Sequence, residues 1–216
     1  MITGLLFTLS EINNFLPHLI AQMGNALYLV LFLLIFCETG LVFMPFLPGD
    51  SILFLCGSLA ASENYHLSIN IMLITLILAS VLGDNINFLI GQKFGNYIFN
   101  HHKLRNLIKP EHVKKANKFF QKYGELAIFT GRFIPIIRTI VPFIAGINKM
   151  EINKFRKFNL LGGSVWVIML LMSGYFIGNI PLIKNHIELL MFLIIIISLI
   201  PVIITFIKEK NQKNEK

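Results

Sequence analysis

The first 92 residues of this 216-residue chain contain no lysine and no arginine. The charged residues in this stretch are all acids, namely Glu11, Glu38, Asp50, Glu63 and Asp84. All lysines and arginines lie from Lys93 onward, and they give the chain its net charge of +8. A basic chain can bind nucleic acid, but 55% hydrophobic and 14% charged residues leave too much apolar sequence for a soluble basic module. We therefore expect no nucleic-acid partner.

Groups suited to redox, metal or covalent chemistry are also scarce. Cys37 and Cys56 lie inside apolar runs, where a cysteine is usually a small buried hydrophobe. His101 and His102 lack a nearby carboxylate or cysteine cluster, so we expect no metal site. We find no nucleophile with a positioned base and no paired histidines of the kind that membrane phosphatases use. The sequence therefore predicts neither an enzyme nor a cofactor, and we assign no catalytic residue.

Long apolar runs are what the chain has instead. Its mean hydropathy is +0.71, and residues 69–90 and 191–207 approach the roughly 20 apolar residues that span a bilayer. The N-terminus lacks the basic n-region of a cleavable signal peptide, so we expect the chain to be retained whole. The sequence predicts an all-α polytopic membrane protein.

The distribution of charge predicts the topology, because cytoplasmic loops carry an excess of lysine and arginine. This rule places residues 93–122, 149–157 and 208–216 in the cytoplasm. We predict one membrane domain over residues 26–207. We expect an interfacial N-terminal segment at 1–25 and transmembrane helices at 69–92, 162–178 and 188–207. We also expect a cytoplasmic amphipathic segment at 93–123 and a basic cytoplasmic tail at 208–216. Within the amphipathic segment, a helix should begin near Pro110 and Glu111.

Two further apolar stretches, 27–61 and 125–147, contain helix-breaking residues. The expected breaks are Pro45, Pro48 and Gly49 in the first stretch and Pro135 and Pro142 in the second. Because both flanks of 125–147 are basic, a re-entrant hairpin that enters and leaves on the cytoplasmic side satisfies the charge rule.

When the sides of the membrane are assigned backward from the cytoplasmic tail, the stretch 27–61 is predicted to form a hairpin that enters and leaves on the outside. One full span plus a half helix is the alternative for this stretch, and it leaves the side of the N-terminus open. Two re-entrant hairpins that face each other, each followed by a transmembrane helix, form an inverted repeat of the kind that builds substrate sites in many secondary transporters.

The stretch 125–147 carries two arginines, and a charge at the centre of a membrane helix costs roughly 2.5–3.5 kcal/mol on insertion scales. Arg132 and Arg138 therefore need partners, and the upstream candidates are Glu38 and Asp50. A guanidinium stays charged and grips phosphate with a planar fork, a geometry that lysine does not match. A poorly solvated carboxylate can take up and release a proton near neutral pH, so we assign proton coupling to Glu38 and Asp50.

An ordered set of residues runs through most of the chain, from about residue 27 to residue 178. The set consists of Glu38, Pro45, Pro48-Gly49-Asp50, Gly83-Asp84, Gly91, Gly131-Arg132-Phe133-Ile134-Pro135-Ile136-Ile137-Arg138, Ala145-Gly146, Trp166 and Gly174-Tyr175-Phe176-Ile177-Gly178. This set resembles the DedA family of bacterial inner-membrane proteins, which shares the SNARE-associated or VTT domain with eukaryotic lipid scramblases. Two positions depart from the family pattern, because Asn87 replaces an expected glycine and Lys93 an expected arginine.

The resemblance implies lipid translocation, including the recycling of undecaprenyl phosphate across the inner membrane, and dependence on the proton motive force. It also implies that Glu38 and Asp50 are the membrane-embedded acids of the family and that Arg132 and Arg138 are its essential arginines. Asp84, Gly131 and Tyr175 are expected to support this site.

Purely structural interpretations of the same residues stay open. The arginines can form structural salt bridges to Glu38 and Asp50 or extend to the cytoplasmic interface. Asp50 can cap the helix that begins near Ser51. Asp84 either bonds within the helix bundle, which we favour, or belongs to a proton path. Two glycine pairs are expected to permit close helix packing, Gly91 with Gly95 and Gly174 with Gly178.

We expect a carrier or flippase for a phosphate-bearing lipid, either undecaprenyl phosphate or a phospholipid. In this hypothesis the arginines bind the phosphate, and protonation of a carboxylate weakens its competing ion pair with them. The expected partners are membrane lipids with anionic or phosphate-bearing head groups, and protons. The alternatives are a proton or cation antiporter that uses the same carboxylates and a non-transporting membrane assembly factor. The identity of the lipid and the formation of a homo-oligomer stay open.

Overall fold

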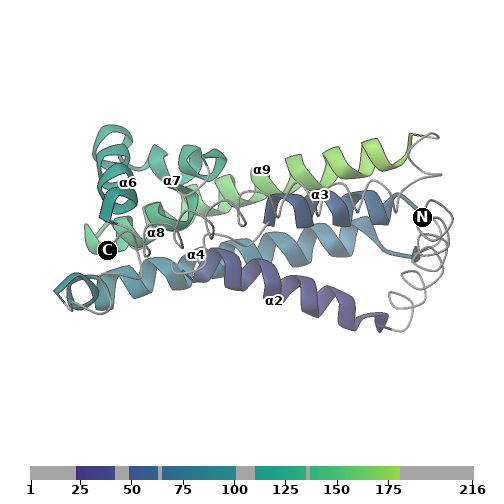
Figure 1. Cartoon of the computed structure of the whole chain (residues 1–216), viewed down its shortest axis with the longest axis horizontal. Coiled ribbons are helices and arrows are strands. Elements are labelled where there is room, and N and C mark those ends of the chain that lie inside the picture. Colours follow the sequence, from purple (N-terminus) through teal and green to yellow (C-terminus); the bar gives the residue numbers. More distant parts are fainter. Residues whose placement is uncertain (1–22, 42–48, 63–64, 101–109, 135–136, 181–216) are drawn as a thin grey trace, which may run out of the picture. The chain divides into compact units, whose positions relative to one another are not determined.

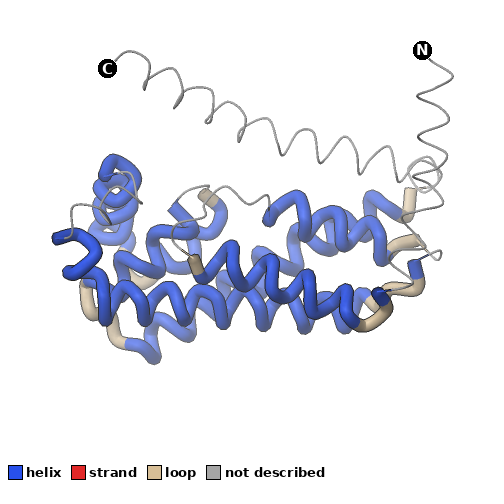
Figure 2. The backbone as a smooth tube through the Cα atoms, turned by 60° about the horizontal axis from the view of Figure 1, so that its bottom comes forward, coloured by secondary structure: helices blue, strands red, loops and turns tan. Residues whose placement is uncertain are grey.

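The computed structural model describes residues 23–41, 49–62, 65–100, 110–134 and 137–180 (Figure 1). Within these ranges every regular element is a helix, as the sequence predicts (Figure 2). The elements are α2 (Ala26–Gly40), α3 (Gly49–Ala60), α4 (Ile69–Asn100), α6 (Pro110–Tyr123), α7 (Leu126–Thr130), the 3₁₀ helix η2 (Gly131–Phe133), α8 (Ile137–Ile147) and α9 (Ile152–Gly178).

The two longest helices, α4 and α9, are long and apolar enough to cross a membrane. Ile69–Gly95 and Ile152–Gly178 each contain 27 residues with a mean hydropathy of 1.9. A helix of this length extends about 40 Å, which exceeds the roughly 30 Å hydrocarbon core of a bilayer. Large apolar side chains are exposed along one stripe of α4, at Ile74, Leu78, Leu82, Ile86 and Leu89. Their spacing of three or four residues gives α4 a face suited to lipid contact.

Both long helices extend past their predicted limits. The sequence predicts a span at 69–92, but α4 continues to Asn100. It also predicts a span at 162–178, whereas α9 begins at Ile152 and takes in much of the basic segment 149–157. Lysine and arginine are good helix formers, so the basic sequence at the start of α9 marks an interface without ending the helix.

The chain forms two compact units, and each is described by itself. Unit 1 contains residues 48–72 and the chain from Leu170, and unit 2 contains Tyr28–Leu47 and Leu73–Met169. In unit 1, α3 packs closely on the last turns of α9. A Cβ atom added to Gly174 would lie 1.9 Å from the Phe54 carbonyl oxygen, and the Ser58 hydroxyl donates to the Gly174 carbonyl at 3.0 Å. The predicted role of the Gly174 and Gly178 pair in close packing is confirmed.

In unit 2, α4 crosses α8 with backbone against backbone. A Cβ atom added to Gly91 would lie 2.2 Å from the Phe143 carbonyl oxygen, and Gly95 faces the side chain of Ile147. The Gly91 and Gly95 pair therefore also permits close packing, as predicted. Around this crossing lies a buried apolar cluster that α4, α7, α8, α9 and the amphipathic helix α6 share. Its largest buried side chains are Phe88, Phe143 and Phe155.

Replacing Gly146 with alanine is expected to destabilise this crossing. The added Cβ atom would lie 2.1 Å from the Phe88 carbonyl oxygen and 2.7 Å from the Gln92 nitrogen, and backbone atoms cannot move aside locally. Overpacking of this kind typically costs about 1–3 kcal/mol. The check is the thermal unfolding of purified protein, with Gly131→Ala as the control. Gly131 has a helical φ of −60° and its nearest non-neighbour atoms are 3.5 Å away, so the control should keep the wild-type Tm.

The helix breaks expected at 27–61 and 125–147 have different outcomes. Pro45, Pro48 and Pro135 lie outside the described residues, and Gly49 begins α3. The prediction of a break at Pro142 is wrong, because α8 continues through this residue. Only the carbonyl of Arg138 loses its intrahelical N–H donor there, and such a loss is tolerated in membrane helices. The chain leaves helical geometry at Ile134 instead (φ −111°, ψ 113°), as is typical of a residue before proline.

Several predicted segments cannot be compared with the structure. Residues 1–22 of the N-terminal segment, the helix predicted at 188–207 and the tail at 208–216 lie outside the described residues. In the cytoplasmic segment 93–123, α6 begins at Pro110 and has Glu111 in its first turn, as the sequence predicts.

Candidate functional site

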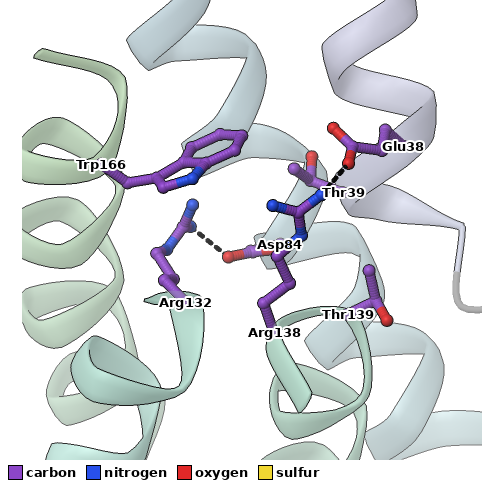
Figure 3. A pocket seen from close by; sticks show the side chains of 7 residues that line it. All are labelled: Glu38, Thr39, Asp84, Arg132, Arg138, Thr139 and Trp166. Carbon is purple, nitrogen blue, oxygen red and sulfur yellow. Dashed lines mark hydrogen bonds and ion pairs between the residues drawn. The ribbon is translucent and has the colours of Figure 1, made fainter. Parts of the chain in front are cut away.

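Five elements of unit 2 bring charged and polar side chains around one small cavity (Figure 3). The side chains fill most of this space, and the cavity volume that they leave is about 10 Å³, roughly enough for one water molecule. The lining residues are Glu38 and Thr39 of α2, Asp84 of α4, Arg132 of η2, Arg138 and Thr139 of α8, and Trp166 of α9. Two acids and two arginines therefore face one space, and their formal charges cancel.

Arg132 is buried and is held by three acceptors. Its Nη2 atom donates to the Asp84 carboxylate and, at 2.5 Å, to Oδ1 of Asn159, while Nη1 donates to the Ser80 hydroxyl at 2.6 Å. The Arg132 and Asp84 side chains are only 5% and 4% exposed. A charge so far from water is tolerated when it is both paired and hydrogen-bonded, as Arg132 is. The Nε atom of Arg132 has no hydrogen-bond partner among the described residues, so the protein does not saturate this guanidinium.

Arg138 forms the second ion pair of the cavity. Its Nη2 atom donates to Oε1 of Glu38 at 2.6 Å, which is the short distance of a charge-assisted hydrogen bond. Glu38 lies in the last turn of α2 and is 2% exposed, whereas the Arg138 side chain is 15% exposed. The pair joins residues that are 100 positions apart in the sequence.

Trp166 contacts both arginines. Its ring centre lies 5.9 Å from Cζ of Arg132 and 5.3 Å from Cζ of Arg138. Figure 3 shows the indole on the α9 side of the cavity, next to the Arg132 guanidinium. At these distances the π system attracts each cation, and the attraction is larger in poorly solvated surroundings. One aromatic ring therefore lines the space that the two guanidiniums share.

Asn87 fixes two of the elements that form the cavity. Its Nδ2 atom donates to the carbonyls of Thr39, at 3.1 Å, and of Thr139, at 2.7 Å, so it joins the end of α2 to the beginning of α8. One turn away, α2 and α4 approach closely, since a Cβ atom added to Gly83 would lie 1.9 Å from Oγ1 of Thr39. These contacts set the relative positions of the helices that carry Glu38, Asp84 and Arg138.

Three of the four residues that the sequence assigns to proton coupling and phosphate binding line this cavity, namely Glu38, Arg132 and Arg138. The fourth, Asp50, lies in the first turn of α3 in unit 1, and its role stays a prediction. Asp84, expected in a supporting position, is the carboxylate that pairs with Arg132. Gly131 begins η2 directly before Arg132, and Tyr175 lies near the end of α9 in unit 1.

Sequence reasoning missed Ser80 and Asn159, the neutral acceptors of Arg132. Both are fully buried. The available signal was a polar residue inside an otherwise apolar helix, which is weak because serine and asparagine also hydrogen-bond between packed membrane helices where there is no site. Which arginine they would contact depends on how the helices pack, and the pattern of one helix does not contain that information.

Comparisons with known proteins identify relatives along nearly the whole chain. Residues 47–176 match the VTT domain. The chain is 38% identical over 201 residues to protein DedA of Escherichia coli K12, an alignment that covers 93% of this chain and 91% of that protein. It is 36% identical over 171 residues to inner membrane protein YqjA of the same organism, covering 79% and 76% of the two chains. No solved structure was found to match.

Inner membrane protein YghB of Salmonella typhimurium is a third relative, with 32% identity over 201 residues that cover 90% of this chain and 89% of the relative. The VTT match takes in more than half of the chain, and two of these three relatives are named as inner membrane proteins. The resemblance drawn from the ordered residue set is thereby confirmed. The chain belongs to the DedA family of bacterial inner-membrane proteins.

Proposed function

We propose that this protein moves a phosphate-bearing lipid, undecaprenyl phosphate or a phospholipid, across the inner membrane. The observation that carries the proposal is the pair of arginines, one buried and one partly buried, that share one cavity with two carboxylates and an indole ring. Buried charges inside a membrane protein are costly and usually mark a substrate or ion path. A guanidinium binds phosphate oxygens with two parallel hydrogen bonds, so the ligand class that best fits two such groups is a phosphate.

The carboxylates compete with the phosphate in this proposal. While Glu38 is ionised it occupies Arg138, and the arginine is unavailable to a second anion. A proton on Glu38 removes the negative charge, weakens the ion pair and releases the guanidinium for the phosphate. Dependence of transport on the proton motive force follows, because each exchange of carboxylate for phosphate involves the uptake of a proton. Asp50, which is predicted to couple protons, would take up and release a proton in the same transport cycle.

The proposed architecture has two re-entrant hairpins that enter from opposite leaflets, with the C-terminus in the cytoplasm. Substituted-cysteine labelling tests it. In a background without Cys37 and Cys56, cysteines introduced by His112→Cys or Ile152→Cys should react with a membrane-impermeant maleimide only after the cells are opened. Labelling of either position from outside intact cells would rule out the hairpin at 125–147.

Reconstitution in liposomes tests the transport proposal. Vesicles contain undecaprenyl phosphate, and an external phosphatase that cannot cross the membrane reports how much head group becomes accessible, with and without a pH gradient. Protein-free vesicles should stop at the outer-leaflet share, whereas vesicles with the protein should continue towards complete hydrolysis. Phosphatidylethanolamine, with an amine-reactive probe, serves as the phospholipid substrate. If the protein accelerates the movement of neither lipid, the proposal is wrong.

The same vesicles distinguish the two alternative functions. A proton or cation antiporter gives proton flux in vesicles without the test lipids, and this flux survives the loss of the arginines. An assembly factor gives neither lipid movement nor flux, and its function in cells survives neutralisation of Glu38.

A further inference from the structure

We infer that the two arginines of the cavity have different tasks. Arg132 is a fixed anchor whose position is set by Ser80 and Asn159, and Arg138 is the arginine that exchanges Glu38 for the lipid phosphate. This inference rests on the proposed function and adds the order of events within the same site.

The neutral acceptors of Arg132 argue for a fixed position. Ser80 and the Asn159 amide remain acceptors at every pH, so Arg132 keeps two partners whatever happens at Asp84. Asn159 is itself held in place, because its Nδ2 atom donates to the Val81 carbonyl at 3.0 Å. The guanidinium is therefore tied to α4 and α9 through groups that do not titrate.

The space around Arg132 also limits its movement. The Arg132 side chain lies against two consecutive glycines of α9. A Cβ atom added to Gly162 would lie 3.3 Å from Cδ of Arg132, and one added to Gly163 would lie 3.3 Å from its Cζ and Nη2 atoms. The helix therefore leaves room for this side chain and little more. Packing of this density holds a side chain in one rotamer.

Arg138 is in a different situation. Its side chain is 15% exposed, three times the exposed fraction of Arg132, so an incoming anion can reach it first. Its ion-pair partner Glu38 is a titratable group on another helix. Trp166 lies 5.3 Å away and attracts the cation without accepting a conventional hydrogen bond, so Arg138 can exchange one acceptor for another and still keep this contact. The other charged groups that face the cavity are Asp84 from α4 and Arg132 from η2.

The fluorescence of Trp166 provides the test, because it is the sole tryptophan of the chain. The full-length protein in lipid nanodiscs is titrated with undecaprenyl phosphate and, as the uncharged control, with undecaprenol. The pH stays above the second ionisation of the phosphate, about 6. Wild-type emission should change with the phosphate lipid alone, and the half-saturating concentration should fall as the pH is lowered, since Glu38 then takes up a proton.

Two acid variants separate the tasks of the arginines. Glu38→Gln should lower the half-saturating concentration about tenfold and remove its pH dependence, since close buried charge pairs couple by at least that factor. Asp84→Asn should keep the pH dependence, because the exchanging carboxylate is still present. The inference would be overturned if both variants lost the pH dependence equally, or if Glu38→Gln did not lower the half-saturating concentration. In either case a wild-type response to the phosphate lipid would still support the proposed function. No wild-type response to the phosphate lipid would overturn both.

Asn159 is tested as a positioning residue. Asn159→Ala should change Trp166 emission in the absence of lipid, because Arg132 can then leave its place near the indole, and it should raise the half-saturating concentration about tenfold. The matched control is Asn148→Ala. This variant removes an exposed asparagine whose side chain donates hydrogen bonds to the Ile144 carbonyl of α8 and to Asn117. Unfolding temperatures identify any variant that fails to fold. A folded Asn159→Ala protein with wild-type emission and wild-type binding would overturn the anchor role.

Discussion

Replacing Arg132 with leucine should lower the free energy of unfolding by about 3–5 kcal/mol, the range measured when one partner of a buried ion pair is removed. The loss is large because Asp84 remains, 4% exposed, without the guanidinium that compensates its charge. Ser80 and Asn159 lose their donor as well. Denaturant or thermal unfolding of the purified protein in a fixed detergent measures the effect.

Two further variants show whether the buried charge is the cause. In the double variant Arg132→Leu/Asp84→Leu no charge is left without a partner, and most of the stability should return although phosphate binding does not. Lys154→Ala removes an exposed ion pair to Glu125, with side chains 54% and 41% exposed, and should leave the stability close to that of the wild type, because solvent screens such a pair. Equal destabilisation by Arg132→Leu and Lys154→Ala would mean that burial of the Arg132 pair has no energetic consequence.

The second large effect concerns transport. Arg138→Lys and Glu38→Gln should each reduce lipid movement in liposomes at least about 30-fold, the factor that corresponds to the lower end of 2–5 kcal/mol for a buried charge pair. Lysine keeps the charge of Arg138 but loses the planar fork that grips phosphate. Glutamine cannot gain or lose a proton as Glu38 does. It therefore cannot become the carboxylate that displaces the phosphate, and the lipid binds but is not released.

The controls for transport use charges away from the cavity. Arg156→Lys changes an exposed arginine of α9 and should move lipid at the wild-type rate. Asp50, predicted to couple protons, and Arg132, predicted to bind phosphate, extend the series, since Asp50→Asn and Arg132→Lys should also abolish transport while the protein still inserts into the membrane. Wild-type rates in all four site variants would remove the site from the transport mechanism.

Much of this fold could be predicted because its signals are local. Apolar runs indicate the helices, and glycine pairs indicate where helices approach closely. The helix limits could not be predicted so well, since the basic residues at the start of α9 favour helix as much as their apolar neighbours do. Pro142 illustrates the same limit, because packing of α8 holds a helix that proline would weaken in isolation.

The pairing within the site was the least predictable part. Sequence reasoning found that Arg132 and Arg138 need acidic partners inside the membrane, because an unpaired charge there is costly. It could not tell that Asp84 pairs with Arg132, since Glu38, Asp50 and Asp84 are equally suitable by residue type. The choice among them is made by the tertiary packing of α2, α4 and α8. Resemblance to the DedA family indicated which charges to expect at the site and gave no pairing.

The most direct test of the central claim is a contact between the lipid phosphate and the cavity arginines. Solid-state NMR on protein with ¹⁵N-labelled arginine, in bilayers that contain undecaprenyl phosphate, measures dephasing of guanidinium nitrogens by the phosphorus nucleus. We predict dephasing in the wild-type protein and in Arg156→Lys, and its loss in Arg138→Lys. Dephasing that is absent from the wild type, or that persists when Arg132 and Arg138 are both lysine, would contradict the claim that this cavity binds the lipid head group.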